Sequence, residues 1–233
     1  MKRGSHKPDH AMCMTRAEVG ALLFTAKNVL GDWRSYYLIT LQYLLGLRVG
    51  EVIKLRYEHL DPRRDRFGDP IIVWVPTEKK GELAKSRSRI CQATGLPLFS
   101  VPVLSHGALI AAAFNRALRP TKEERESPWI LPSLQSAKRF MARRTAIQKF
   151  DLAKSAGYLN DAYTSHTLRH TAATRLYEKC NTTRIVAEFL RHDRTGGRGA
   201  EGATTNRYIH ITTEQWMKYR GCFDLPLPLR PLA

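Results

Sequence analysis

Helical spacing on both sides of one short β-prone run is the feature of this sequence that most constrains its fold. From Thr15 to Leu30, apolar residues recur every three or four positions, and Thr15 and Glu18 have the spacing of a capping box at the start. The run from Ile71 to Val75 is rich in β-branched and aromatic residues, which favour a strand. The pattern predicts a mainly α-helical fold with a small antiparallel β-hairpin or sheet.

The same periodicity predicts the other helices. They are expected at Tyr36–Leu45, from Val49, at Ala108–Leu118, Leu134–Lys154, Thr167–Lys179 and Thr183–Arg191, and from near Thr213. The lysine-rich stretch from Glu78 to Lys85 should be the tip of a basic hairpin, with its return strand over Ser86–Gln92. Four glycines between Asp193 and Ala203 predict a loop with little to pack against.

The charge balance narrows the class of partner. The chain has 38 Lys and Arg residues against 21 Asp and Glu, a formal net charge of +17, which favours a polyanion. Charge alone leaves DNA, RNA, a ribosomal surface and an anionic membrane open. The apolar stretches fall short of a membrane span, and no export leader is visible, so we expect a cytoplasmic protein.

The cysteines and histidines do not indicate a metal site. Cys13, Cys91, Cys180 and Cys222 are widely dispersed and form no C-x-x-C pair, so neither zinc nor disulfides are expected. His166 and His170 have the spacing of a zinc helix but lack the glutamate that such a motif carries between them.

The densest cluster of reactive side chains runs from Ser165 to Thr171. Its spacing of three puts His166 and Arg169 on one helix face, an arrangement that is by itself more typical of a surface or an interface. Upstream, Arg48 lies at an apolar helix junction where an unpaired charge would be costly. His192 and Tyr208 follow downstream.

Taken in order, these residues and the hairpin lysines resemble the active-site series of the tyrosine recombinase (phage integrase) family. His166–Leu176, HTLRHTAATRL, is similar to the H-x-L-R-H signature, and Gly46–Glu51, GLRVGE, to the first arginine box. The resemblance extends from about Thr15 to the last predicted helix. It implies a tyrosine recombinase catalytic-domain fold and site-specific recombination or integration for a mobile element. It also implies a homotetramer on synapsed sites in double-stranded DNA, without a cofactor.

The expected chemistry is strand cleavage through a 3′-phosphotyrosyl intermediate. Arg48 and Arg169 suit the oxygens of a pentacoordinate phosphate, whose charge must be neutralised in the absence of a metal. Tyr208 is the expected nucleophile. Because a tyrosine hydroxyl has a pKa near 10, it needs help, for which His166 is the candidate.

The resemblance implies that His192 hydrogen-bonds the scissile phosphate and helps to position Tyr208. A hairpin lysine would protonate the leaving 5′ oxygen, with Lys80 the first choice and Lys79 the second, although all of these lysines could instead contact phosphates only. Glu51 is expected to orient Arg48 or cap the turn. The candidate DNA contacts are Lys79, Lys85, Arg87, Arg89 and Arg207.

Three features depart from the family pattern. Arg191 stands where a glycine usually precedes the second histidine, which questions the local turn. Fifteen residues separate His192 from Tyr208, more than is usual. Only about 14 residues precede the first predicted helix, so no N-terminal core-binding domain is expected and the chain is either a catalytic fragment or a minimal recombinase.

The expected organisation is a disordered basic arm over 1–13, a catalytic domain over 14–224 and a Pro-rich tail over 225–233. Two other functions stay open. A type IB topoisomerase has closely similar active-site residues but relaxes DNA as a monomer. A catalytically inactive DNA-binding module of the same fold is the second, favoured by Arg191 and the long loop.

Overall fold

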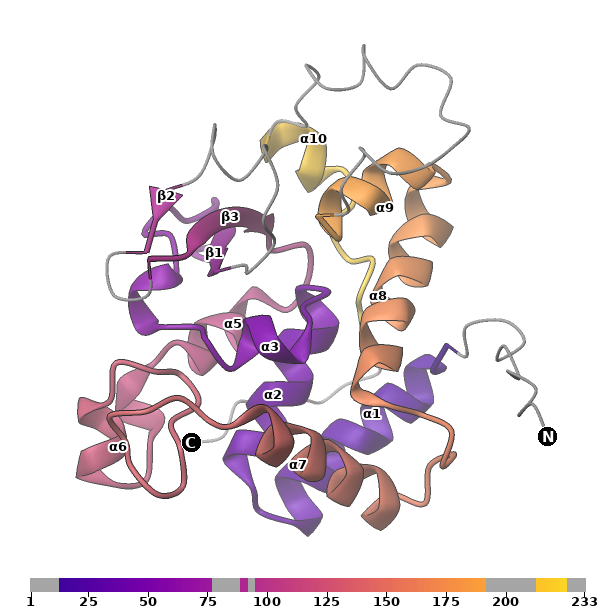
Figure 1. The fold of residues 1–233 in the computed structure, drawn as a ribbon. Coiled ribbons are helices and arrows are strands. Elements are labelled where there is room, and N and C mark those ends of the chain that lie inside the picture. Colours follow the sequence, from indigo (N-terminus) through magenta and orange to yellow (C-terminus); the bar gives the residue numbers. More distant parts are fainter. Residues whose placement is uncertain (1–12, 77–88, 92–94, 192–212, 226–233) are drawn as a thin grey trace, which may run out of the picture.

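The part of the chain before the sheet is helical (Figure 1). The structure is a computed structural model that describes residues 13–76, 89–91, 95–191 and 213–225. Thr15 and Glu18 form the predicted capping box. The elements before the sheet are α1 (Arg16–Phe24), the π-helical turn η1 (Thr25–Val29), α2 (Trp33–Leu44), α3 (Val49–Val52) and the 3-10 turn η2 (Tyr57–His59).

A small antiparallel sheet follows, as the sequence predicts. Its strands are β1 (Ile72–Pro76), β2 (Arg89–Ile90) and β3 (Pro97–Pro102), in the order β1-β3-β2. The predicted pairing is wrong in detail, because β1 pairs with β3 and not with the return strand over Ser86–Gln92. The prolines that begin and end β3 conceal this central strand from the sequence pattern, but strand ends are where a missing N–H is tolerated.

The rest of the described chain is mainly helical. Its elements are α5 (Gly107–Ala113), η3 (Arg116–Leu118), α6 (Lys122–Glu126), α7 (Arg143–Ala156), α8 (Ser165–Cys180), α9 (Thr183–Phe189) and α10 (Thr213–Met217). The helix predicted from Leu134 begins nine residues later, at Arg143. Before it, the chain folds back on itself, with Met141 N donating to Leu131 O at 2.9 Å and Ser133 N to Arg139 O at 2.8 Å. These backbone bonds replace the helix that the composition favours.

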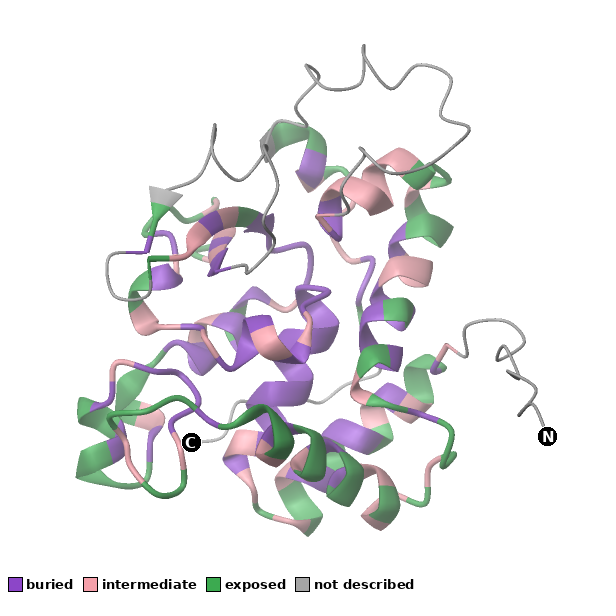
Figure 2. Ribbon diagram, viewed as in Figure 1, coloured by how far each residue is buried: buried purple, intermediate pink, exposed green. Residues whose placement is uncertain are grey.

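Helix α2 is the centre of the core. Every residue of α2 except Arg34 is buried, and Figure 2 shows it as the most continuously buried element. It contacts α1, α3, α5, α7 and α8. A helix that is buried on nearly all sides needs no polar face, which explains why most of its side chains are aromatic or aliphatic.

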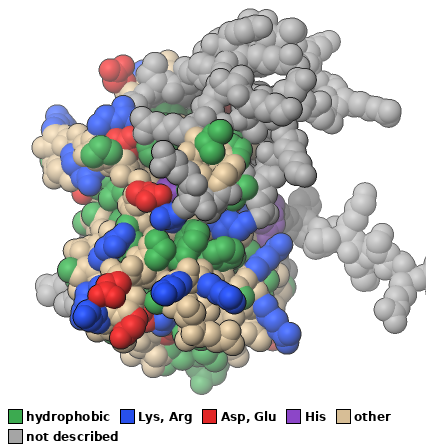
Figure 3. All heavy atoms as spheres, turned by 60° about the vertical axis from the view of Figure 1, so that its left-hand side comes forward, with side chains coloured by type: hydrophobic (Ala, Val, Ile, Leu, Met, Phe, Trp, Pro, Cys, Tyr) green, Lys and Arg blue, Asp and Glu red, His purple; other side chains and the backbone are tan. Residues whose placement is uncertain are grey.

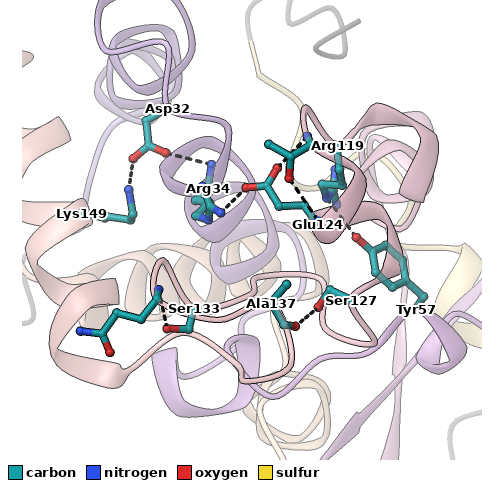
Figure 4. Close-up of polar contacts among 11 residues, drawn as sticks. Asp32, Arg34, Tyr57, Arg119, Glu124, Ser127, Ser133, Ala137 and Lys149 are labelled. Carbon is teal, nitrogen blue, oxygen red and sulfur yellow. Dashed lines mark hydrogen bonds and ion pairs between the residues drawn. The ribbon is translucent and has the colours of Figure 1, made fainter.

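The N-terminal end of α2 is fixed by two ion pairs (Figure 4). Asp32 caps the helix by accepting from Arg34 N at 3.1 Å, and its other carboxylate oxygen pairs with Lys149 of α7. The Arg34 side chain pairs with Glu124 of α6. These contacts attach α6 and α7 to the central helix.

A buried arginine ties the segment between α5 and α6 to the same end of α2. Arg119 is only 1% exposed, and its guanidinium lies against the rings of Trp33, Tyr37 and Tyr57, at 4.6, 4.8 and 5.7 Å from their centroids. Its Nε donates to the Tyr57 hydroxyl at 3.1 Å. The aromatic faces compensate for the burial of this charge.

The described surface carries both signs of charge and several exposed hydrophobic side chains. Figure 3 shows Lys and Arg side chains spread over one face, with acidic side chains between them. Among the described residues, no helix combines the length and the apolar character needed to cross a membrane. Cys13, which the sequence assigns to the arm over 1–13, places its Sγ 3.0 Å from Thr174 Oγ1. Leu225, which the sequence assigns to the tail over 225–233, is buried and donates its N–H to His106 Nε2 at 3.1 Å.

Candidate active site

Arg48 and Glu51 form a local unit at the start of α3. Arg48 is the N-cap residue, and its backbone N–H donates to Glu51 Oε2 at 2.8 Å. The Arg48 guanidinium lies 3.2 Å from Glu51 Oε1, and 35% of its side chain is exposed. Glu51 thus caps the turn and orients Arg48, the two roles that the sequence suggests for it, and the arginine stays open to solvent.

Gly46 connects this unit to two distant helices. Its φ of +57° is the left-handed region that glycine adopts most easily. Its carbonyl accepts a hydrogen bond from Arg169 of α8. A Cβ at this position would lie 2.6 Å from Cε1 of Phe189 in α9, so only glycine fits without displacement.

Arg169 approaches the same carboxylate from α8. Its side chain is buried, donates to the carbonyls of Gly46 and Leu190, and places Nη1 3.7 Å from Glu51 Oε2. Burial, together with the like charges of Arg191 and Arg48, lowers the pKa of Arg169 from its usual value. The structure therefore brings together Arg48 and Arg169, the two arginines that the sequence singles out, around one glutamate.

A third arginine, Arg191, joins them, which the sequence did not reveal. Its Nη2 lies 2.8 Å from Glu51 Oε2, and its Nη1 donates to Phe189 O at 3.2 Å. Its φ of +55° is the left-handed conformation that a glycine would favour. The turn after α9 therefore exists despite the departure from the family pattern.

The protonation state of Glu51 follows from this environment. Burial alone would raise its pKa, but Arg191, the Arg48 backbone N–H, Arg169 and the Arg48 guanidinium together hold it below its usual range. The carboxylate is ionised at neutral pH and sits among three guanidiniums. The cluster as a whole carries excess positive charge, as an anion-binding site requires.

His166 lies at the beginning of α8, one turn from Arg169. Its side chain is on the exposed side of the helix, with its ring centroid 4.5 Å from that of His170. Desolvation lowers the pKa of His166, and electrostatic interactions with His170, Arg169 and Arg48 lower it further. The imidazole is neutral at pH 7 and able to accept a proton.

The other predicted site residues lie outside the described residues. These are Lys79, Lys80, Lys85, Arg87, His192, Arg207 and Tyr208. Arg89 belongs to strand β2, but its side chain is not described. The described elements that flank these segments are β1 and β2 for the lysines, and α9 and α10 for His192 and Tyr208.

One other group of side chains has the composition of a metal site. Glu58, His59 and Cys91 place ligand atoms within 4.8 Å of one another. However, His59 Nδ1 accepts from Arg56 N at 3.2 Å, and burial, with Arg56, lowers the His59 pKa to about 4, so the neutral ring carries its proton on Nε2. Neither nitrogen then offers a free lone pair. The sequence-based expectation of no metal stays a prediction.

The fold and the arginine cluster define a class of protein, the catalytic domains of tyrosine recombinases. The chain belongs to the phage integrase family, whose sequence profile matches residues 13–215. It is 29% identical over 203 residues to the tyrosine recombinase XerD of Caulobacter vibrioides, covering 86% of this chain and 58% of that protein. To XerD of Rhizobium meliloti it is 27% identical over 188 residues, covering 81% and 50%. The chain thus spans about half the length of these relatives.

Solved structures support the same fold. The integrase from mycobacterium phage Brujita superposes with a TM-score of 0.58 at 18% identity, covering 95% of this chain and 62% of that one. XerA recombinase gives 0.57 at 18% identity, covering 92% and 63%. The lambda integrase catalytic core gives 0.51 at 18% identity, covering 78% of this chain and 95% of that one. The predicted fold class is confirmed.

Proposed function

We propose that residues 14–224 are the catalytic domain of a site-specific DNA recombinase or integrase that cuts and rejoins double-stranded DNA through a 3′-phosphotyrosyl link at Tyr208. The observation that carries this proposal is the convergence of Arg48 and Arg169 on Glu51, next to His166. Family membership gives this cluster its chemical meaning.

Arg48 and Arg169 would neutralise the scissile phosphate as its charge rises in the transition state. Arg48 is partly exposed and held by a single carboxylate, so it can turn toward a phosphate. Arg169 uses one N–H on each terminal nitrogen for a backbone carbonyl, and a guanidinium has further N–H groups to donate. Such an arrangement removes the need for a metal ion in the cleavage step.

His166 would assist deprotonation of the Tyr208 hydroxyl, which is a poor nucleophile at neutral pH. The lowered pKa of His166 keeps its ring neutral and therefore able to accept that proton. His192 would donate to the scissile phosphate. Attack by Tyr208 then leaves a phosphotyrosine on the 3′ end and a free 5′ hydroxyl, and reversal of the step on another strand reseals the DNA.

Lys80 would protonate the leaving 5′ oxygen, because it precedes Gly81 near the expected hairpin tip. A substrate with sulfur in place of that oxygen provides the test, since a thiolate leaves without protonation. Lys80→Ala should be slow on normal DNA and recover on the sulfur substrate, whereas Lys85→Ala should be equally impaired on both. Selective recovery of Lys79→Ala or Lys85→Ala instead would move the role to that lysine.

The working assembly would be a homotetramer on synapsed sites of double-stranded DNA. Structurally similar proteins include a lambda integrase dimer bound to a core site and a lambda integrase tetramer bound to a Holliday junction. The net charge of +17 is consistent with a DNA partner. Lys79, Lys85, Arg87, Arg89 and Arg207 are the proposed DNA contacts, and association with the nucleoid in the cytoplasm would follow.

The names of the matched relatives favour recombination over the two alternatives, a type IB topoisomerase and an inactive module. Relaxation of supercoiled DNA that contains no recombination site would separate the first alternative from the proposal. Failure to form any covalent adduct would favour the second.

The decisive experiment uses nicked suicide duplexes drawn from DNA that flanks the gene. Tyr208→Phe should abolish covalent protein–DNA adducts and leave DNA binding nearly unchanged, because only the nucleophilic oxygen is removed. Tyr163→Phe is a matched control, since the buried Tyr163 hydroxyl donates to Glu18 at 2.9 Å. Adducts that persist in Tyr208→Phe would overturn the assignment of the nucleophile.

A further inference from the structure

The active-site carboxylate has more cationic partners than two active-site arginines supply. Glu51 Oε2 accepts from Arg48 N at 2.8 Å and from Arg191 Nη2 at 2.8 Å, with Arg169 Nη1 at 3.7 Å. Its other oxygen, Oε1, contacts the Arg48 guanidinium at 3.2 Å. Arg191 and Arg169 thus share Oε2, and Arg48 alone uses Oε1.

The backbone at Arg191 is held in a conformation that its side chain does not favour. A φ of +55° is uncommon for residues other than glycine, asparagine and aspartate, and costs free energy. The guanidinium end of Arg191 makes bonds on two sides, to Glu51 and to the Phe189 carbonyl. A glycine there would adopt this conformation without strain but would supply no cation to Glu51.

That role follows from the charge of Glu51. A buried carboxylate with too few partners binds the remaining cations more tightly, because the low local dielectric strengthens each attraction. Without Arg191, the Glu51 carboxylate would draw on Arg48 and Arg169 alone. The scissile phosphate must bind these same two arginines, so stronger ion pairs between them and Glu51 would weaken the binding of the phosphate.

We propose that Arg191 is a positioning residue that occupies Glu51, so that Arg48 and Arg169 remain available to the scissile phosphate. This inference rests on the proposed function. Arg191 acts through Glu51. At this position the family usually has a glycine, whereas this chain has a positively charged side chain. The same ion pair fixes the C-terminal end of α9 to α3 immediately before His192.

The test measures single-turnover cleavage of a saturating suicide duplex by the full chain. Arg191→Gly removes the charge and relieves the strained backbone, and it should slow the cleavage step by about tenfold while substrate affinity changes less. Arg191→Asn, which also tolerates the left-handed region, should behave alike. Lys122→Ala, which removes one charge from the exposed Lys122–Glu126 pair, is the control and should cleave at the wild-type rate.

A double variant separates charge balance from a merely structural role. In Glu51→Gln/Arg191→Gly the unbalanced carboxylate is gone, so cleavage should recover several-fold relative to Arg191→Gly, with thermal melting reporting that each variant is folded. A double variant that is as slow as Arg191→Gly or slower would overturn the proposal, as would an unchanged rate in Arg191→Gly. Absence of adducts with the wild-type protein would instead count against the proposed function.

Discussion

Replacing Gly46 with alanine should destabilise the protein far more than the same change at a glycine of equal backbone conformation. At φ +57°, the left-handed conformation costs an alanine about 1–2 kcal/mol of folding free energy. Its Cβ would also lie 2.6 Å from Phe189 Cε1 and 3.1 Å from Leu190 Cδ2. Forcing a methyl group into a packed interior costs about 1–3 kcal/mol more. The expected total is about 2–5 kcal/mol.

Gly31 is the matched control for this measurement. Its φ is +58°, but a Cβ there would meet nothing within 4 Å, so Gly31→Ala should cost only the backbone contribution of about 1–2 kcal/mol. Urea denaturation of both variants gives the difference directly, provided that the m-values agree with the wild type.

Gly46→Ala should also slow cleavage, because the Gly46 carbonyl that accepts from Arg169 would shift with the backbone. Gly31→Ala should leave the rate unchanged. Equal losses of stability in the two variants would refute the reasoning, since they would mean that contact with α9 contributes nothing at Gly46.

Three further predictions concern pH and ions. His59 has a pKa of about 4 in the fold against roughly 6.5 in the unfolded chain, so the unfolded state gains the proton first as the pH falls. Between pH 7.5 and pH 5, the free energy of unfolding should therefore decrease by about 2 kcal/mol more in the wild type than in His59→Gln, as measured by urea titrations. Because only neutral His166 accepts a proton and its pKa is lowered, the cleavage rate should reach half its maximum at a pH below about 6.5, the ordinary pKa of histidine, and a midpoint above that value would contradict this role. Cleavage should survive EDTA, and a strict Mg²⁺ requirement for the chemical step would be inconsistent with the proposed site. DNA affinity should decrease steeply with increasing salt concentration, and an affinity that does not change with salt would contradict the proposed DNA contacts.

The sequence predicted what depends on local patterns. The helical periodicity located α2 and α8 to within a few residues, and its first helix corresponds to α1 continued by the π-helical turn η1. The capping pair Thr15 and Glu18 marked the start of α1 correctly. Strand β3 was missed because Pro97 and Pro102, which are strand breakers in the interior, stand at its two ends. The return segment before Arg143 was missed because its backbone pairs with residues 131–133 in a local chain reversal that the apolar spacing does not indicate.

The residues of the candidate site likewise divide into those that a local motif indicates and those that it does not. Arg48, His166 and Arg169 could be singled out because each lies in a short motif. Arg191 could be seen only as a departure from a pattern, since its partner Glu51 is 140 residues away in the chain. The left-handed backbone at Arg191 had one indirect signal, the glycine that the family usually has at this position.

The central position of α2 has a consequence for the dynamics of the arginine cluster. The N-terminal end of α2 is fixed by the ion pair between Asp32 and Lys149. Just beyond its C-terminal end, the Gly46 carbonyl accepts a hydrogen bond from Arg169. Amides of a helix that is buried on all sides exchange with solvent only when the whole domain opens. The protection of α2 amides should therefore correspond to the free energy of global unfolding, so that Arg48 follows directly on the part of the chain that opens last.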